Sequence, residues 1–202
     1  MEVNKQLAKK NIELLRKHNV TAIDIMGSIG AGKTSLIEKL VQMLKKRYRI
    51  AVFKGDLTTT IDAERIGRHG VKVVTINTGL ECHLDANVVS KAVERISLQD
   101  IDLLFIENVG NLICPAEFPL GTEKRLVIVS VTEGPYMVVK HPFTFMTADV
   151  TVINKKDLAD IMKVDTEQLK KQVKEIKPNM KVAVTNALTG EGVEELIEAL
   201  EL

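Results

Sequence analysis

The chain has 202 residues and a formal net charge of +1, and 45% of its residues are hydrophobic while 27% are charged. This balance is typical of a globular protein and gives no sign of a nucleic-acid or membrane partner. No apolar run approaches the roughly 20 residues of a membrane span, and the lysine-rich N-terminus lacks the apolar segment of a signal peptide. We therefore expect one cytoplasmic domain over residues 1–202, whose two cysteines are free thiols or metal ligands.

Strands and helices alternate along the chain after a first amphipathic helix. That helix is predicted at residues 3–18, within an N-terminal segment 1–19. We expect strands at residues 22–26, 49–54, 72–77, 102–107, 126–132, 150–154 and 181–185, and further helices at 34–46, 61–68, 85–97, 166–176 and 193–200. Strands such as LLFIE and LVIVSV are apolar throughout, as parallel strands covered on both faces usually are. The pattern predicts a three-layer α/β domain with a mostly parallel sheet of about seven strands.

Residues 27–35 read GSIGAGKTS and fill the pattern Gly-x-x-x-x-Gly-Lys-Thr. Such a loop presents backbone N–H groups at a helix N-terminus, where the helix dipole favours an anion. Lys33 can reach the terminal phosphates of a nucleotide, and the Thr34 hydroxyl can bind Mg²⁺. A glycine-rich turn that matches by chance is the alternative, but an apolar strand precedes the loop and an amphipathic helix follows it. We therefore predict a P-loop NTPase fold with phosphate contacts at Gly27, Ser28, Gly30, Ala31, Gly32, Lys33, Thr34 and Ser35.

The quartet Asn154-Lys155-Lys156-Asp157 favours guanine as the base. A carboxylate at Asp157 can accept from both N1–H and the 2-amino group of guanine, which adenine cannot match. Lys155 would cover the purine face with its aliphatic stem, and Asn154 would tie the loops together. A solvated charged turn is the alternative interpretation. The later stretch TNALTGEG resembles the closing loop of GTPases, where Asn186 replaces a serine and the Ala187 N–H could reach the guanine 6-oxo group.

Glu107 and Gly110 end an apolar strand where GTPases usually carry Asp-x-x-Gly. The carboxylate would hold Mg²⁺, and the Gly110 N–H would sense the γ-phosphate. Asp56 could bind Mg²⁺ or position the attacking water, or it could cap a helix together with residues 58–60. Asp62 is interpreted as a first-turn helix residue.

The predicted catalytic residues are Lys33, Asp56, Glu107 and Gly110. Asn111 follows Gly110 where a Ras-like protein carries the glutamine that orients water. We therefore expect slow GTP hydrolysis, on the order of 10⁻⁴ to 10⁻³ s⁻¹ without a partner.

Cys82, His83 and Cys114 form a second group of candidate ligands, predicted to lie at the same end of the sheet. Two thiolates and an imidazole suit Zn²⁺ or Ni²⁺, although buried or capped cysteines are the ordinary interpretation. Three ligands are one short of a closed tetrahedral site. Water or a second chain related by a two-fold axis would complete it.

Three segments, NTGLECHLDA (77–86), IENVGNLICPA (106–116) and GDLTTTIDAERI (55–66), resemble the hydrogenase nickel-incorporation GTPases, the HypB family. The resemblance covers nearly the whole chain and implies a GTP-dependent dimer that delivers nickel to the large subunit precursor of nickel–iron hydrogenase with other maturation proteins. It implies Ni²⁺ or Zn²⁺ ligands at Cys82, His83 and Cys114, and nucleotide or Mg²⁺ contacts at Lys33, Thr34, Asp56, Glu107 and Asp157. Residues 133–137 depart from the family pattern, and the N-terminus carries no cysteine motif or histidine-rich tract.

Three alternatives remain open from the sequence. A urease accessory GTPase shares the phosphate loop and guanine motif, but it carries Cys-Pro-His where this chain has Cys82-His83-Leu84. A P-loop kinase is disfavoured by NKKD. A metal-binding module with a purely structural nucleotide would bind metal equally with GDP and with a GTP analogue.

Overall fold

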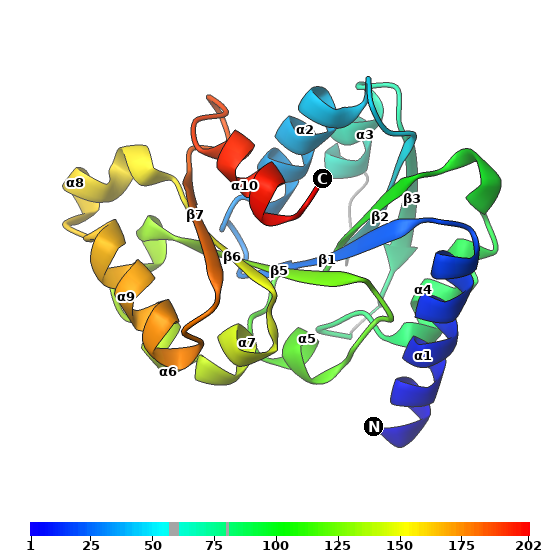
Figure 1. The fold of residues 1–202 in the computed structure, drawn as a ribbon, viewed down its shortest axis with the longest axis horizontal. Coiled ribbons are helices and arrows are strands. Elements are labelled where there is room, and N and C mark those ends of the chain that lie inside the picture. Colours follow the sequence, from blue (N-terminus) through cyan, green and yellow to red (C-terminus); the bar gives the residue numbers. More distant parts are fainter. Residues whose placement is uncertain (57–60, 80) are drawn as a thin grey trace.

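The computed structural model describes residues 1–56, 61–79 and 81–202, with the backbone alone at residue 56. These residues form a seven-stranded sheet in the order β3-β2-β4-β1-β5-β6-β7 (Figure 1). Every pairing between the described strands is parallel, which confirms the predicted α/β fold and makes the sheet wholly rather than mostly parallel. The strands are β1 (Thr21–Gly27), β2 (Ile50–Asp56), β3 (Lys72–Asn77), β4 (Leu103–Glu107), β5 (Lys124–Ser130), β6 (Val150–Asn154) and β7 (Lys181–Thr185).

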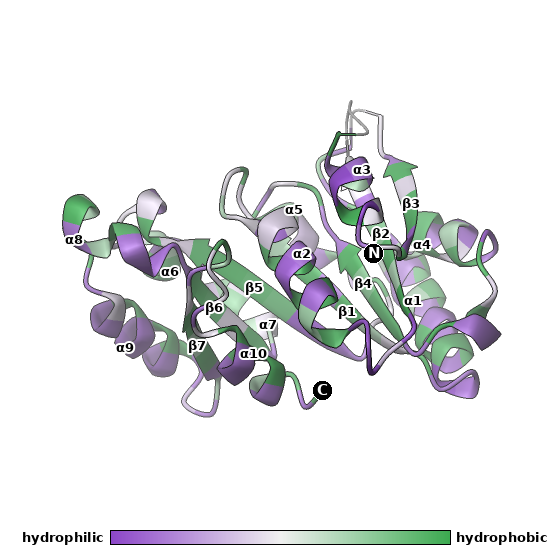
Figure 2. Cartoon of the chain, turned by 90° about the horizontal axis from the view of Figure 1, so that it is seen from above, coloured by the Kyte–Doolittle hydropathy of each residue, from purple (hydrophilic) through white to green (hydrophobic). Residues whose placement is uncertain are grey.

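Helices cover both faces of the sheet, because strands that are apolar on both sides must be buried on both sides. One face carries α2 (Lys33–Leu44), α3 (Ile61–Gly67) and α10 (Val193–Ala199). The other carries α1 (Glu2–Lys17), α4 (Ala86–Val93), α6 (Met137–Lys140), α7 (Pro142–Thr147) and α9 (Thr166–Ile176) (Figure 1). Hydrophobic residues concentrate on the strands, while the outer sides of the helices are mostly hydrophilic (Figure 2). Within the described residues, no helix has the length and apolar content needed to cross a bilayer.

The elements lie where the sequence pattern places them, with shifts of one or two residues at several ends and two differences beside 3-10 turns. The helix predicted at 85–97 ends at Val93, and a 3-10 turn, η1 (Leu98–Asp100), follows. The strand predicted at 126–132 occupies 124–130, because residues 131–133 form a 3-10 turn, η2, capped by Ser130.

Sequence reasoning missed several short elements, since a single helical turn carries almost no periodic signal. They are α5 (Cys114–Glu117), α6, α7, α8 (Ala159–Met162) and the 3-10 turn η3 (Lys156–Leu158).

The N-terminal helix holds the start of α4, which follows the loop after β3. Asn11, buried in α1, donates to the carbonyl oxygens of Ala86 (2.8 Å) and Leu120 (3.0 Å). Asp85 caps α4 by accepting from the Val88 N–H at 2.8 Å. The loop that carries the first cysteine therefore ends on a fixed support.

Candidate functional site

The predicted phosphate loop joins the carboxyl end of β1 to the N-terminus of α2. Gly27 approaches β5 so closely that a Cβ there would lie 2.8 Å from the Ile128 carbonyl oxygen. Gly32, with φ of 98°, precedes α2, and a Cβ there would lie 2.3 Å from Asn154 Nδ2. Both positions therefore require glycine, for close approach at the first and for backbone conformation at the second.

Lys33 is buried at the start of α2, and its ammonium folds back over the loop. Its Nζ donates to the carbonyl oxygens of Gly27 (2.9 Å) and Ser28 (3.0 Å). Burial lowers the pKa of Lys33 below its usual range, and the nearby Glu107 carboxylate opposes that shift. A positive charge thus lies at the loop where phosphate binding requires one.

A hydroxyl, two carboxylates and an ammonium meet beside this loop. Thr34 Oγ1 donates to Glu107 Oε1 at 2.8 Å, and it lies 3.2 Å from Asp62 Oδ2, the alternative acceptor for its hydrogen. Lys54 Nζ donates to Glu107 Oε1 at 2.5 Å. Glu107 is almost fully buried, and its Oε2 has no hydrogen-bond partner among the described residues. Hydroxyl and carboxylate oxygens are the donors that Mg²⁺ prefers, so this set, with a buried unpaired oxygen, fits Mg²⁺.

Lys54 and the site role of Asp62 were missed by sequence reasoning. Asp62 does lie in the first turn of α3, as predicted, but its carboxylate also faces Thr34. Arg65 holds that carboxylate at 3.1 Å and pairs with Glu38 of α2 at 2.5 Å, which fixes α3 beside the phosphate loop. A lysine directly after the apolar run IAVF of β2 is the signal that could have identified Lys54 as a residue worth examining.

Two predicted catalytic residues lie at the carboxyl edge of the sheet. Asp56 ends β2, but its side chain and the predicted cap at residues 58–60 lie outside the described residues. Gly110 lies against the phosphate loop, where a Cβ would lie 2.4 Å from Ile29 Cγ1. The segment after β4 is therefore in direct contact with the loop that would hold the phosphates.

Asn154 connects three segments at the other end of the phosphate loop, as predicted. Its Nδ2 donates to the Ala31 carbonyl at 2.9 Å. Its Oδ1 accepts from Thr185 Oγ1 and from the Ala187 N–H, both at 3.1 Å. The Ala187 N–H that was predicted to meet a guanine oxygen is thus bonded to Asn154.

The remaining residues of the guanine motif shape the same end of the site. Lys155 adopts a left-handed conformation with φ of 61°, and its Nζ lies 3.4 Å from Thr132 Oγ1. Asp157 is exposed. Asn186 accepts from the Leu188 N–H at 3.0 Å, which closes the turn after β7.

A cleft of about 770 Å³ brings these groups together. It extends from the guanine motif, along the phosphate loop, to the loop after β3. Its lining includes Gly30, Gly32, Lys33, Thr34, Ser35, Lys54, Asp62, Cys82, Glu107, Gly110, Asn111, Asn154, Lys155, Asp157, Asn186 and Ala187.

Cys82 lines one end of this cleft. The Cys114 thiol lies close to it, and their interaction raises the pKa of Cys82 above its usual value. Cys82 Sγ is 3.8 Å from His83 Nδ1, and the His83 ring stacks on Phe118 with centroids 3.9 Å apart. Asn111 Nδ2 donates to the Cys82 carbonyl at 3.3 Å. Among the residues described, no three His, Cys, Asp or Glu side chains are arranged as a metal site. One chain therefore supplies neighbouring thiols and an imidazole, but not a preformed set of ligands.

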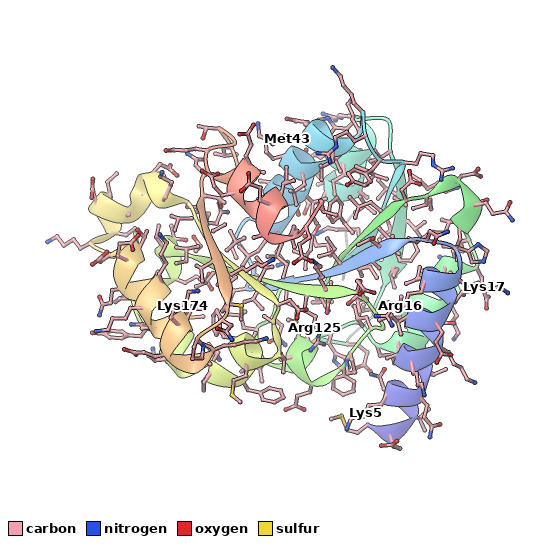
Figure 3. The ribbon with its side chains drawn as sticks, in the orientation of Figure 1. Lys5, Arg16, Lys17, Met43, Arg125 and Lys174 are labelled. Carbon is pink, nitrogen blue, oxygen red and sulfur yellow. The ribbon has the colours of Figure 1, made fainter. Side chains whose placement is uncertain are left out.

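A buried carboxylate in β1 supports the backbone beside both cysteines. Asp24 Oδ1 accepts from Asn108 Nδ2 at 3.0 Å, and its Oδ2 is 3.5 Å from Arg125 Nε. Asn108 accepts from the Leu84 N–H at 3.1 Å. Arg125 reaches from β5 toward α5 (Figure 3), where it donates to the carbonyls of Pro115, Ala116 and Phe118.

Desolvation dominates the ionisation of Asp24. Burial raises the pKa of Asp24 to about 6, although Arg125 and Asn108 oppose that shift.

Comparison with known proteins agrees with this geometry. Residues 21–184 match the family model described as "CobW/HypB/UreG, nucleotide-binding domain". The chain is 52% identical over 201 residues to the probable hydrogenase maturation factor HypB of Methanocaldococcus jannaschii, covering all of this chain and 91% of that protein.

Solved structures give the same relationship. The hydrogenase maturation factor HypB of Archaeoglobus fulgidus matches with a TM-score of 0.93 at 45% identity, over 100% of this chain and 98% of that one. HypB of Helicobacter pylori, solved in complex with nickel, matches with a TM-score of 0.92 at 33% identity, over 98% and 93% of the two chains. The chain therefore belongs to the HypB hydrogenase maturation factors of the CobW/HypB/UreG family.

Proposed function

We propose that this maturation factor binds GTP and GDP and hydrolyses GTP slowly. The observation that carries the proposal is the single cleft that joins Asp157 and Lys155 to the phosphate loop. The exposed Asp157 carboxylate is free in space to accept from N1–H and the 2-amino group of guanine, and adenine would leave this charged acceptor unpaired. Lys155 and Ala187 line the same end of the cleft, where the aliphatic stem of Lys155 would cover the purine face.

The groups beside the phosphate loop have the chemistry that phosphoryl transfer needs. The Lys33 ammonium neutralises charge on the terminal phosphates, and Thr34 and Glu107 would hold Mg²⁺, which when bound polarises the phosphate oxygens. Gly110 would donate its N–H to the γ-phosphate, and Asp56 remains the proposed Mg²⁺ or water contact. Asn111 stands where a Ras-like protein carries the glutamine that orients water, and its amide donates to the Cys82 carbonyl, which supports an unassisted rate of about 10⁻⁴ to 10⁻³ s⁻¹.

Nickel is the proposed cargo, bound at Cys82, His83 and Cys114, with Zn²⁺ as the other ion that suits these ligands. The H. pylori relative was solved in complex with nickel, which supports this assignment. Because one chain lacks a preformed three-ligand arrangement within its described part, we infer that a second copy completes the site. Exposed Ile29, Ile113 and Leu188 around the cleft provide apolar surface for that contact.

GTP would favour the dimer, and the dimer would carry nickel to the large subunit precursor of nickel–iron hydrogenase together with other maturation proteins. The near-neutral charge of the chain supports a protein partner rather than nucleic acid or membrane, and the proposed compartment is the cytoplasm.

Base selection tests the proposal. In Asp157→Asn, preference should move from guanosine to xanthosine nucleotides by at least about tenfold, because an amide can donate to the 2-oxo group of xanthine. Calorimetric titration of GDP and XDP into the two proteins measures the change, and γ-labelled GTP should release free phosphate only. Unchanged GDP preference in the variant would overturn the base assignment, and label transferred to a small acceptor would indicate a kinase instead.

A further inference from the structure

We propose that Lys54 is a built-in cation of the nucleotide site, whose ammonium occupies the position of Mg²⁺ and must be displaced when the ion enters. The inference rests on the proposed nucleotide function, and it concerns how strongly that function depends on Mg²⁺. A basic residue at this place makes nucleotide binding less dependent on the metal than the phosphate loop alone would suggest.

The partners of Lys54 are the oxygens that fit Mg²⁺. Its Nζ lies 2.5 Å from Glu107 Oε1, 3.3 Å from Thr34 Oγ1 and 3.5 Å from Asp62 Oδ2. Lys54 and Glu107 are register partners on the neighbouring strands β2 and β4, so the sheet itself places them side by side. A cation between one hydroxyl and two carboxylates is the arrangement that a divalent metal would adopt with the same groups.

Burial makes the Lys54 ammonium and the Glu107 carboxylate depend on each other. The side chains of Lys54 and Glu107 are 7% and 1% exposed, so neither charge can rely on solvent and each depends on the other. Mg²⁺ cannot reach Glu107 Oε1 while the ammonium is bonded there, because like charges repel strongly at such distances.

The Lys54 ammonium can turn into the nucleotide cleft when Mg²⁺ enters. Both Lys54 and Lys33 line the cleft that would hold the phosphates. In its present position the ammonium neutralises Glu107 and lends positive charge to a bound phosphate. After displacement the ammonium can turn toward the phosphates, and Mg²⁺ then takes its place at the Glu107 carboxylate.

The experiment is calorimetric titration of GDP into the wild type and Lys54→Met, each with millimolar Mg²⁺ and with EDTA. Methionine keeps the length and apolar stem of the side chain but removes the charge. In the wild type, replacing Mg²⁺ by EDTA should weaken GDP binding by less than about tenfold. In Lys54→Met the same replacement should weaken GDP binding by a factor at least about ten times larger, because a positive charge near the phosphates is lost. The exposed Lys46→Met is the matched control and should behave like the wild type.

The outcomes separate the two proposals. If the wild type binds no guanine nucleotide under either condition, the proposed function fails. If GDP binds but the ratio of EDTA to Mg²⁺ dissociation constants is unchanged in Lys54→Met, Lys54 is not the cation. Should Lys54→Met fail to fold, the wild type still decides: a ratio below about tenfold supports the inference, and any larger ratio overturns it.

Discussion

At the scale of single residues, Asp24 shows how a buried charge makes stability depend on pH. Its pKa of about 6 in the folded protein lies above the ordinary value of 3.8, chiefly because burial penalises the carboxylate. The folded protein therefore holds this proton more tightly than the unfolded chain does. The stabilisation is fully present below pH 3.8 and is lost as the pH rises through about 6.

Asp24→Asn should remove this pH dependence. Between about pH 4 and pH 7, the free energy of unfolding of the wild type should fall by roughly 2–3 kcal/mol relative to the variant, as the shift in pKa implies. Urea unfolding at several pH values measures the difference between the two curves. Asp160→Asn, at an exposed carboxylate, should run parallel to the wild type. Parallel curves for Asp24→Asn as well would show that Asp24 keeps an ordinary pKa.

Single residues also mark the limit of sequence reasoning. Lys33, Thr34 and Asn154 could be assigned because each belongs to a contiguous motif whose neighbours dictate the backbone. Lys54 could be noticed only as a charge in a buried strand, because no neighbouring residue in the chain indicates that Glu107 lies opposite it on β4.

At the scale of elements, the loops after β1, β6 and β7 form one unit through the Asn154 side chain. Asn154 is buried and makes hydrogen bonds to Ala31, Thr185 and Ala187. Its removal leaves buried donors and acceptors without partners, which costs more than the loss of the bonds themselves.

Asn154→Ala should therefore lower the free energy of unfolding by roughly 2–4 kcal/mol and weaken GDP binding. Chemical unfolding measures the first effect and calorimetric titration the second. Asn179→Ala replaces an exposed asparagine and should change stability by less than about 0.5 kcal/mol. A variant of Asn154 as stable as that control would mean that the three loops are held by other contacts.

Contacts between elements also determine where the short helices form. α5 begins at Cys114 and Pro115, and Arg125 of β5 binds its carbonyl oxygens. A turn this short is held by such tertiary contacts rather than by its own propensity. The long helices α1 and α9 were predictable because their apolar residues recur at helical spacing.

At the scale of the whole molecule, the sheet brings the nucleotide cleft and the cysteines to one edge. Asn111 bridges them, since it pairs with Gly27 of the phosphate loop and donates to the Cys82 carbonyl. Under the proposed function, nucleotide and metal would therefore act on the same backbone, and a second chain placed over this edge would contact both.

Cys114→Ala tests that arrangement. With a GTP analogue and Ni²⁺, the variant should bind at most half as much metal as the wild type, and its dimer should dissociate at least about tenfold more readily, because a ligand at the contact is lost. Sedimentation with GDP or the analogue, with and without Ni²⁺ and Zn²⁺, measures both quantities. Glu117→Ala, on the exposed side of the same helix, is the control. Full metal content and an intact dimer in Cys114→Ala would contradict a shared site.

The sequence by itself determined the class of fold, the phosphate loop, the guanine motif and the family resemblance. Each of these is written in contiguous residues: apolar runs make buried parallel strands, and glycine spacing makes a phosphate loop. Only the tertiary structure decided that Lys54 stands among Thr34, Asp62 and Glu107, and that Asp24 supports the backbone beside Cys82 and Cys114 through Asn108 and Arg125. Those contacts depend on strand order and register across the sheet, which are set by the packing of the whole chain and not by any local pattern.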